Sequence, residues 1–224
     1  MTLSVVIPAL EATATLADTL LSLTEANEVV VVDGGSLDDT VAVAIRHGAR
    51  VINAPKGRGC QLATGASLAR GEWLLFLHAD TRLAPHWKTA VDMFTADVRN
   101  KERAATFGLK LDDDSHQARR LERMVAWRAR WLGLPYGDQG LLLHREFYAA
   151  LGGYKAWPVM EDVDLVRRIG RSRLVTLPIA AYTDASRWKR DGWTARSLRN
   201  VFCLTLYFLH VPPRLIARIY GYQC

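Results

Sequence analysis

Acidic side chains follow three apolar segments in the first half of the sequence. They are Glu11, Asp33 and Asp80, which come after residues 3–8, 28–32 and 73–77. Short apolar runs between polar or glycine residues are typical of strands buried on both faces of a sheet. Because the carboxyl ends of parallel strands lie at one edge, we expect the three carboxylates to face one crevice. Such a crevice could hold a divalent cation or a ribose.

A basic, glycine-containing loop is expected at the same edge. Residues 54–59 read APKGRG and follow a short predicted strand at residues 50–53. Lys56 and Arg58 supply positive charge, and the two glycines let the backbone approach a phosphate closely. The combination favours a nucleoside diphosphate bound with a hard metal ion. The sequence has no GxxxxGK(S/T) and no GxGxxG after the first strand, which disfavours a P-loop and a dinucleotide site.

Strands and helices alternate along the first 81 residues, and they must position the acidic residues and the basic loop. Residues 1–81 are predicted to follow the order strand, helix, strand, helix, strand, helix, strand. This order indicates parallel strands joined by right-handed crossovers, as in half of a Rossmann-type sheet. The predicted fold class is therefore α/β, with a mostly parallel sheet flanked by helices and with further helices at the C terminus.

The second half mixes both kinds of element. Hydrophobic spacing predicts helices over residues 85–98, 117–132, 145–151 and 160–169, and strands over residues 104–111, 141–143 and 174–177. From residue 194 on, two helices separated by Pro212 and Pro213 are expected to close the chain.

Positive charge is concentrated at the C-terminal end. The 224-residue chain has a formal charge of +6, and residues 187–224 contain seven Lys or Arg against Asp191 alone. This segment is either a solvated tail or a surface for phosphates or anionic lipid. Its apolar stretch, with Phe202, Leu206 and Leu209 at helical spacing, is interpreted as core. A peripheral membrane contact and a homodimer face are the alternatives.

Cysteine usage and the N terminus predict the compartment. Cys60, Cys203 and Cys224 are few and widely spaced, which suits a reducing environment. The chain shows no signal peptide, and none of its apolar runs approaches the roughly 18 residues needed to span a bilayer. We expect a soluble, cytoplasmic protein, with the inner membrane face as an alternative location.

Four short motifs occur in an informative order. They are VVIPALEA at residues 5–12, VVDGGSLDDT at 31–40, FLHADT at 76–81 and MEDVDL at 160–165. Over nearly its whole length the chain resembles the family 2 glycosyltransferases, which are inverting enzymes of the GT-A fold. The VDGGS, HADT and MEDVDL variants are most similar to a small bacterial subgroup, the radical-SAM/selenodomain-associated transferase 2 proteins.

The resemblance implies a donor site built on the first half of the chain. Pro8, Ala9 and Glu11 would border the base and ribose of a nucleotide-diphosphate sugar, with a UDP-sugar as the expected donor. Asp33, followed by Gly34, would accept a hydrogen bond from the base. Each carboxylate also has a structural interpretation, because Asp33 can cap a helix and Glu11 can favour a helix N terminus.

The resemblance also implies the catalytic groups, and we expect Glu11, Asp33, Asp80 and Asp162 to meet around one cavity. Asp80 would bind a divalent metal, Mn²⁺ or Mg²⁺, which offsets charge on the leaving diphosphate. Asp162 would be the general base that deprotonates the hydroxyl of an acceptor. The structural alternatives are a turn role for Asp80 and a helix-dipole role for Asp162.

Position 78 departs from the family pattern, which often has Asp-x-Asp where this sequence has His78-Ala79-Asp80. His78 could ligate manganese but suits magnesium poorly, or it could hydrogen-bond the sugar. The other departure is Asp33-Gly34-Gly35, where many members carry two aspartates before Gly-Ser.

Further residues are assigned by their place relative to the motifs. Arg187 is expected to bind the diphosphate, with Lys56 and Arg58, and Trp188 to stack on a sugar. The acceptor side is expected to include Tyr136, Asp138, Gln139, Trp188 and Glu161. The single GT-A domain over residues 1–224 would thus divide into a nucleotide-binding half (1–81), an acceptor-binding half (82–186) and a basic helical segment (187–224).

The sequence therefore predicts a metal-assisted, inverting glycosyltransferase with a hydroxyl-bearing acceptor. A nucleotidyltransferase is the nearest enzymatic alternative, but residues 9–15 lack the Gly- and Arg-rich loop that it would need. A non-catalytic nucleotide-sugar-binding protein is a second alternative, against which Asp80 and Asp162 argue. A nucleic-acid partner is not expected, because no recognised fold motif accompanies the basic segment.

Overall fold

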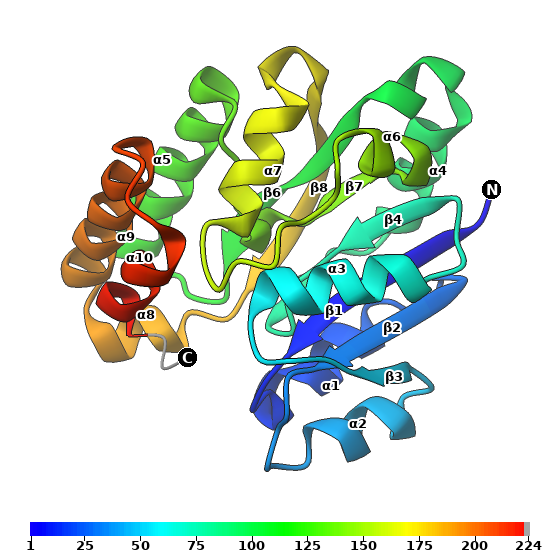
Figure 1. The fold of residues 1–224 in the computed structure, drawn as a ribbon, viewed down its shortest axis with the longest axis horizontal. Helices are drawn as coiled ribbons and strands as arrows, with labels where there is room; N and C mark the ends of the chain where they lie inside the picture. Colours follow the sequence, from blue (N-terminus) through cyan, green and yellow to red (C-terminus); the bar gives the residue numbers. More distant parts are fainter. Residues whose placement is uncertain (222–224) are drawn as a thin grey trace.

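A computed structural model describes residues 1–221, so Cys224 lies outside the described residues. Four parallel strands form the first half of the sheet: β1 Leu3–Ala9, β2 Glu28–Asp33, β3 Arg50–Asn53 and β4 Trp73–Phe76. They are joined by helices α1 Thr13–Leu21, α2 Thr40–Arg46 and α3 Arg58–Leu68 (Figure 1). The predicted alternation over residues 1–81 is confirmed.

The sheet continues into the second half of the chain in the order β3-β2-β1-β4-β7-β6-β8-β5. The added strands are β5 Thr81–Leu83, β6 Ala104–Leu111, β7 Leu141–His144 and β8 Leu174–Thr183. Strand β7 runs antiparallel to both of its neighbours, β5 is antiparallel to β8, and β6 is parallel to β8. The predicted α/β class is confirmed, with the parallel character concentrated in the first half.

Two strands differ from the prediction. Strand β8 passes through Pro178, although an end at Leu177 was expected. The register between β6 and β8 shifts between Thr106 and Gly108, and such an irregularity accommodates a residue without a backbone N–H. Strand β5 was not predicted, because three residues are too few to show a pattern, and its pairing with β8 alone defines it.

The remaining helices lie on both sides of the sheet and at one end of it (Figure 1). They are α4 Trp87–Ala96, α5 His116–Leu132, α6 Arg145–Ala150, α7 Glu161–Ile169, α8 Ser186–Asp191, α9 Trp193–Phe208 and α10 Pro213–Tyr220, with short 3-10 turns η1 Val98–Glu102, η2 Gly137–Gln139 and η3 Arg171–Arg173. Helix α8 was not predicted.

The sheet buries apolar side chains on both faces. Val5 and Val6 are neighbours in β1, but they belong to different core clusters because successive strand residues point to opposite faces. One cluster includes residues of α1 and α4, and the other includes residues of α3 and α7. All four residues of β4 are buried, as expected for a central strand covered on both sides.

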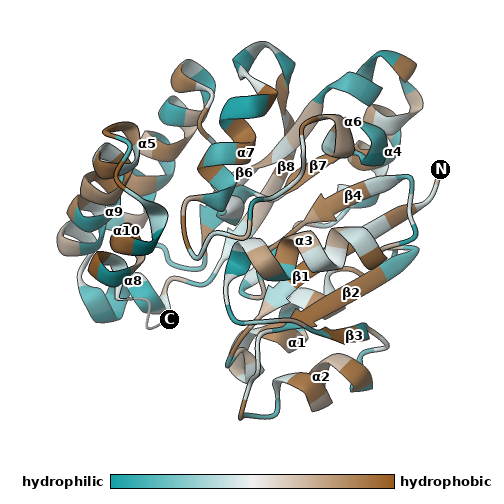
Figure 2. Ribbon diagram, viewed as in Figure 1, coloured by the Kyte–Doolittle hydropathy of each residue, from teal (hydrophilic) through white to brown (hydrophobic). Residues whose placement is uncertain are grey.

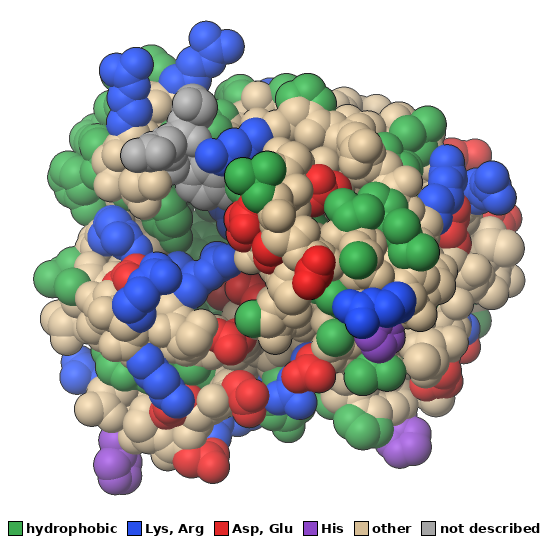
Figure 3. All heavy atoms as spheres, turned by 90° about the horizontal axis from the view of Figure 1, so that it is seen from below, with side chains coloured by type: hydrophobic (Ala, Val, Ile, Leu, Met, Phe, Trp, Pro, Cys, Tyr) green, Lys and Arg blue, Asp and Glu red, His purple; other side chains and the backbone are tan. Residues whose placement is uncertain are grey.

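The C-terminal helices correct one interpretation. Cys203 of α9 packs with Ile216 and Ala217 of α10, but Phe202 and Leu209 are 53% and 69% exposed. The interpretation of this stretch as core is therefore wrong for those two residues. Figure 2 shows apolar residues along α9, and Figure 3 shows hydrophobic side chains gathered on that side of the surface. Within residues 1–221, none of the helices combines the length and apolar character needed to cross a membrane.

Candidate active site

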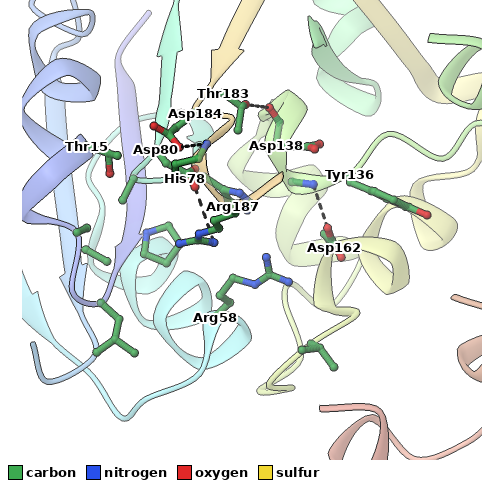
Figure 4. Close-up of a pocket in the computed structure, with 18 of the residues that line it drawn as sticks. Thr15, Arg58, His78, Asp80, Tyr136, Asp138, Asp162, Thr183, Asp184 and Arg187 are labelled. Atoms are coloured by element: carbon green, nitrogen blue, oxygen red, sulfur yellow. Dashed lines mark hydrogen bonds and ion pairs between the residues drawn. The ribbon is translucent and has the colours of Figure 1, made fainter. Parts of the chain in front are cut away.

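A cavity of about 460 Å³ lies at the carboxyl ends of β1 and β4. Its walls come from the segments after these two strands, the loop before η2, the start of α7, and helices α8 to α10. Figure 4 shows Asp80, Asp162, Arg58 and Arg187, from four different elements, around this space. Open α/β sheets bind ligands at this edge, so the cavity is the candidate active site.

The structure brings most of the predicted site residues to this cavity. Those that line it are Pro8, Ala9, Glu11, Arg58, Asp80, Tyr136, Asp138, Asp162, Arg187 and Trp188. Those that are not among its lining residues are Asp33, Gly34, Lys56, Gln139 and Glu161. The expectation that four key carboxylates meet around one cavity therefore holds for Glu11, Asp80 and Asp162, but not for Asp33.

Asp80 follows β4 and its side chain is 17% exposed. Its Oδ1 is buried without a hydrogen-bond partner among the described residues, and its Oδ2 lies 3.8 Å from Nη1 of Arg187. The backbone carbonyl of Asp80 accepts a hydrogen bond from the Asp184 N–H at 3.0 Å, which fixes the turn. A buried carboxylate oxygen without a donor is costly, so Asp80 is suited to take up a cationic partner.

The donor set around Asp80 fits a divalent metal that a diphosphate also coordinates. No group of three or more His, Cys, Asp or Glu side chains within residues 1–221 is arranged to hold a metal ion. Mg²⁺ sites of enzymes that act on phosphates often use only one or two carboxylates, the other ligands being phosphate oxygens and water. The unpartnered Oδ1 of Asp80 matches such a site, whereas a complete protein cage is not found there.

His78 lies two residues before Asp80 and also lines the cavity. The pKa of His78 is lowered to about 4, mainly by burial and also by the positive charge of Arg58, while Asp80 and Asp162 act in the opposite direction. The imidazole is therefore neutral at pH 7, with one nitrogen able to donate and the other able to accept. Neutral imidazole is compatible with both roles expected for this position, metal ligation and a hydrogen bond to the sugar.

Asp162 occupies the first turn of α7, where helix N–H groups favour a carboxylate. Its Oδ2 accepts a hydrogen bond from the Gly137 N–H at 2.9 Å, and its Oδ1 accepts one from the Val163 N–H at 2.8 Å. A Cβ atom on Gly137 would stand 2.5 Å from Nε2 of His78, so a glycine is needed between the two side chains. The carboxylate of Asp162 is thus held in a fixed orientation at the cavity wall, as a general base requires.

Tyr136 and Asp138 flank Gly137 in the same loop. The guanidinium carbon of Arg128 lies 3.4 Å from the centroid of the Tyr136 ring, a cation–π contact that fixes the ring. Burial raises the pKa of Asp138 to about 6, and its Oδ1 has no hydrogen-bond partner among the described residues. Both side chains line the cavity and offer oxygen atoms suited to a hydroxyl-bearing acceptor.

Two residues expected at the acceptor are buried instead. The side chain of Glu161 is 0% exposed, and its Oε1 lies 2.9 Å from Nε of Arg58. Burial raises the pKa of Glu161 to about 7, opposed by the charge of Arg58. The amide of Gln139 donates to the carbonyl of Phe107 at 3.1 Å inside the protein. Glu161 holds the Arg58 guanidinium at the cavity wall. Neither Glu161 nor Gln139 lines the cavity where an acceptor would bind.

The loop after β2 is also arranged differently from the expectation. The carboxylate of Asp33 accepts hydrogen bonds from the Gly35 N–H at 2.9 Å, the Ser36 N–H at 3.0 Å and the Ser36 hydroxyl at 2.5 Å. These contacts stabilise a turn. The structural alternative expected for Asp33, a cap on the next helix, is wrong, because α2 begins at Thr40 with Asp39 at the N-cap position. Gly34 packs against Gln61, and Lys56 is exposed outside the cavity.

Glu11 lies between this loop and the cavity. It adopts the left-handed region with φ of 49°, which is uncommon for a residue with a side chain. Its Oε1 accepts a hydrogen bond from the Leu37 N–H at 2.7 Å, while its own N–H donates to the Ser36 hydroxyl at 3.0 Å. These two bonds join the segment after β1 to the segment after β2.

Gln61 is a site residue that the sequence analysis missed. It lies in α3, is 3% exposed and lines the cavity. Its Nε2 donates to the carbonyl oxygens of Ala9 and Val32, both at 2.8 Å, and so ties together the ends of β1 and β2. A glutamine within a helix carries no sequence signal of this kind, and only the tertiary contacts identify it.

Helices α8 to α10 close the cavity on the side away from β1. Arg187 is 60% exposed, and the ring of Trp188 stacks on Trp193 with centroids 5.9 Å apart. Asn200 and Tyr220, neither of which was predicted, complete this wall. The aromatic surface could pack against a sugar ring, as expected for Trp188, but the short helix that presents it was not foreseen.

The first part of the chain is similar in sequence to known proteins. Residues 4–97 match the family model described as Glycosyl transferase family 2. An uncharacterized glycosyltransferase of Rickettsia felis is 36% identical over 86 residues, which are 38% of this chain and 30% of that protein. A Rickettsia conorii relative is 35% identical over 86 residues. The aligned part spans 38% of this chain and 30% of each of these two relatives.

Solved structures agree over most of the chain. Glucosyl-3-phosphoglycerate synthase from Mycobacterium tuberculosis, in complex with Mn²⁺, UDP and glucosyl-3-phosphoglycerate, has a TM-score of 0.63 at 21% identity, covering 94% of this chain and 81% of that chain. Staphylococcus aureus TarS has a TM-score of 0.66 at 14% identity, covering 99% of this chain and 43% of that one. The predicted GT-A fold is confirmed by these neighbours.

Proposed function

We propose that this protein is an inverting glycosyltransferase that moves a sugar from a nucleotide-diphosphate sugar to a hydroxyl-bearing acceptor. The observation that carries the proposal is the arrangement of Asp80 and Asp162 on one cavity at the carboxyl edge of the sheet. Similar structures bind UDP-glucose with Mn²⁺ or UDP-GlcNAc, which supports a UDP-sugar as the donor. We also propose that the chain belongs to the radical-SAM/selenodomain-associated transferase 2 subgroup.

The donor would occupy the side of the cavity formed by the segments after β1 and β4. Pro8, Ala9 and Glu11 border that side. Arg58 and Arg187 would supply positive charge for the diphosphate, because one guanidinium group can donate hydrogen bonds to two phosphate oxygens at once. The buried Glu161 would keep Arg58 in place, through the 2.9 Å ion pair, while a ligand enters.

Asp80 would hold a divalent cation, Mn²⁺ or Mg²⁺, together with the diphosphate. When bound, the cation would neutralise negative charge on the leaving nucleoside diphosphate. The neutral imidazole of His78 would contact the sugar or the cation from the adjacent position.

Asp162 would take the proton from the acceptor hydroxyl as that oxygen attacks the anomeric carbon. The Gly137 and Val163 N–H groups would hold its two oxygens in position for this transfer. The acceptor would bind beside Tyr136, Asp138 and Trp188. Attack from the face opposite the diphosphate would invert the anomeric centre.

A panel of nucleotide sugars tests the proposal by thermal shift, with and without Mn²⁺. A donor that binds only the folded state should raise the melting temperature by mass action, and Mn²⁺ should enlarge the shift. In Asp162→Asn the shift should persist, while transfer to a hydroxyl acceptor falls by about 100-fold or more.

Three results would contradict the proposal or part of it. If none of the nucleotide sugars shifts the melting temperature, the donor site is wrong. If Asp162→Asn transfers sugar at the wild-type rate, Asp162 is not the base. If nucleoside triphosphates bind and release pyrophosphate, the nucleotidyltransferase alternative is favoured.

A further inference from the structure

The last two helices expose large apolar side chains on the sides turned away from the contact between them. The apolar residues concerned are Leu198, Val201, Phe202 and Phe208 of α9, its C-cap residue Leu209, and Leu215 and Ile219 of α10, each between 42% and 69% exposed. We refer to these seven side chains as the apolar face. Exposed apolar surface gathered in this way is uncommon on a monomer and usually marks an interaction site.

The opposite sides of the same helices are already engaged. Cys203, Ile216 and Ala217 are buried and pack together, and Asn200 and Tyr220 line the cavity. Residues of a helix are rotated by about 100° each, so Leu198 and Phe202 point away from the side that bears Cys203. Folding of residues 1–221 therefore uses one side of α9 and leaves the other uncovered.

Arginines without acidic partners lie beside the apolar face. Arg214 and Arg218 of α10 are exposed, and neither forms an ion pair with a carboxylate within residues 1–221. By contrast, Arg196 and Arg199 on α9 both contact Asp191, at 2.7 and 2.9 Å. Figure 3 shows Lys and Arg side chains around the hydrophobic group on this side of the molecule.

Helix α5 exposes a similar combination of apolar and basic side chains. Trp127 and Trp131 are 56% and 54% exposed one helical turn apart, and Arg120 and Arg123 are exposed next to them. Its inner side packs with Trp193 at the start of α9, so the two helices are neighbours. Tryptophan and arginine at a surface are the residue types that settle between lipid headgroups and acyl chains.

We propose that the apolar face docks on an anionic lipid bilayer, with α9 and α10 lying in the plane of the interface. Apolar side chains would enter the headgroup region, while Arg214 and Arg218 contact lipid phosphates. A second copy of the chain fits less well, because a two-fold contact through this face would bring the same unpaired arginines together. This surface lies outside the donor site, so the inference does not depend on the proposed reaction.

Vesicle co-sedimentation of the full chain tests the proposal directly. The protein should bind vesicles of phosphatidylcholine mixed with phosphatidylglycerol, bind much less to phosphatidylcholine alone, and dissociate as salt is raised. Phe202→Ser and Leu209→Ser should each weaken binding roughly tenfold, because each withdraws a large apolar side chain from the interface. Arg214→Gln and Arg218→Gln should each weaken it about fivefold.

Matched controls come from exposed apolar residues elsewhere on the surface. Leu37 and Met93 are 96% and 74% exposed, so Leu37→Ser and Met93→Ser change surface hydrophobicity by a similar amount and should leave vesicle binding unchanged. The melting temperature of every variant should match the wild type, since these side chains are not in the core.

Other outcomes would overturn the proposal. Equal loss of binding in the control variants, or equal binding to neutral vesicles, would rule out a specific anionic-lipid surface. Absence of vesicle binding together with a dimer that Phe202→Ser dissociates, measured by light scattering, would assign the face to a second copy instead.

Discussion

Two aspartates at the same edge of the sheet have opposite surroundings. Asp33 is the last residue of β2, and its carboxylate accepts three hydrogen bonds from Gly35 and Ser36 in the loop that follows. Asp80 follows β4, and its Oδ1 has no hydrogen-bond partner among the described residues. The two positions look alike in sequence, because each is an acidic residue at or shortly after the end of an apolar strand.

The difference shows that a strand-end carboxylate becomes available to a ligand only when its loop does not satisfy it. Gly35 and Ser36 present N–H groups to Asp33, so the loop after β2 is stabilised internally. The turn after β4 uses the backbone carbonyl of Asp80 for its contact with Asp184, and leaves the carboxylate to the cavity. We therefore expect Asp33 to contribute mainly to stability and Asp80 mainly to ligand binding.

The largest expected effect comes from Asp80→Asn. The variant should lose the Mn²⁺-dependent part of the donor thermal shift, and kcat/KM for transfer should fall about 100-fold or more. Steady-state kinetics with a Mn²⁺ titration measures both. A variant that retains wild-type activity and metal dependence would remove the contrast between Asp80 and Asp33.

A pH-dependent effect is expected at Glu161. Its pKa is raised from 4.5 to about 7 in the folded protein, so the folded state binds a proton more tightly than the unfolded state. The free energy of unfolding should therefore fall as pH rises from about 4.5 to about 7. The glutamine of Glu161→Gln cannot ionise. The free energy of unfolding of the wild type, relative to that of the variant, should therefore fall by ~2–3 kcal/mol as pH rises across this window.

Urea unfolding at several pH values measures this difference. His78 contributes the opposite slope, because its pKa is lowered to about 4 and stability is lost as pH falls below about 6.5. That contribution is present in both proteins and cancels in the comparison. A difference that does not change with pH would show that folding does not raise the pKa of Glu161.

The free energy of unfolding should depend on Asp33 more than on Asp80, the reverse of the order expected for ligand binding. Asp33→Ala should lower the free energy of unfolding by about 2 kcal/mol, because two N–H groups and a hydroxyl lose their acceptor. Asp80→Ala, measured without metal, should leave stability unchanged or raise it slightly, because it removes a poorly satisfied buried oxygen. Equal destabilisation by the two substitutions would contradict the comparison.

The smallest effect is expected at Gly137. Gly137→Ala places a methyl group 2.5 Å from Nε2 of His78, so the imidazole or the Gly137 backbone, which donates to Oδ2 of Asp162, must move. We expect kcat/KM to fall about tenfold with little change in donor binding. Gly108→Ala is the matched control, because its nearest contact would be an ordinary 3.6 Å from a carbonyl oxygen. Similar kinetics for both variants would show that Gly137 does not position Asp162.

The sequence predicted the framework and part of the site. The alternation of elements over residues 1–81, the buried strand β4, and the long helix at residues 117–132 all follow from local periodicity, which is written in the order of residues. Asp80 and Asp162 were expected at one cavity, and they line the same one. This expectation rested on the motifs, because no local rule relates residues so far apart.

The sequence did not determine which side of each helix or strand is buried against the rest of the protein. Glu161 and Asp162 are adjacent, yet one is fully buried against Arg58 and the other lines the cavity, because a helix turns them to different sides. The same cause leaves Phe202 exposed while Cys203 is buried. Residue order alone determined where strands and helices form and where acidic groups follow them. Only the tertiary structure decided which of those groups remain unsatisfied, because burial and hydrogen bonding depend on partners brought together from distant parts of the chain.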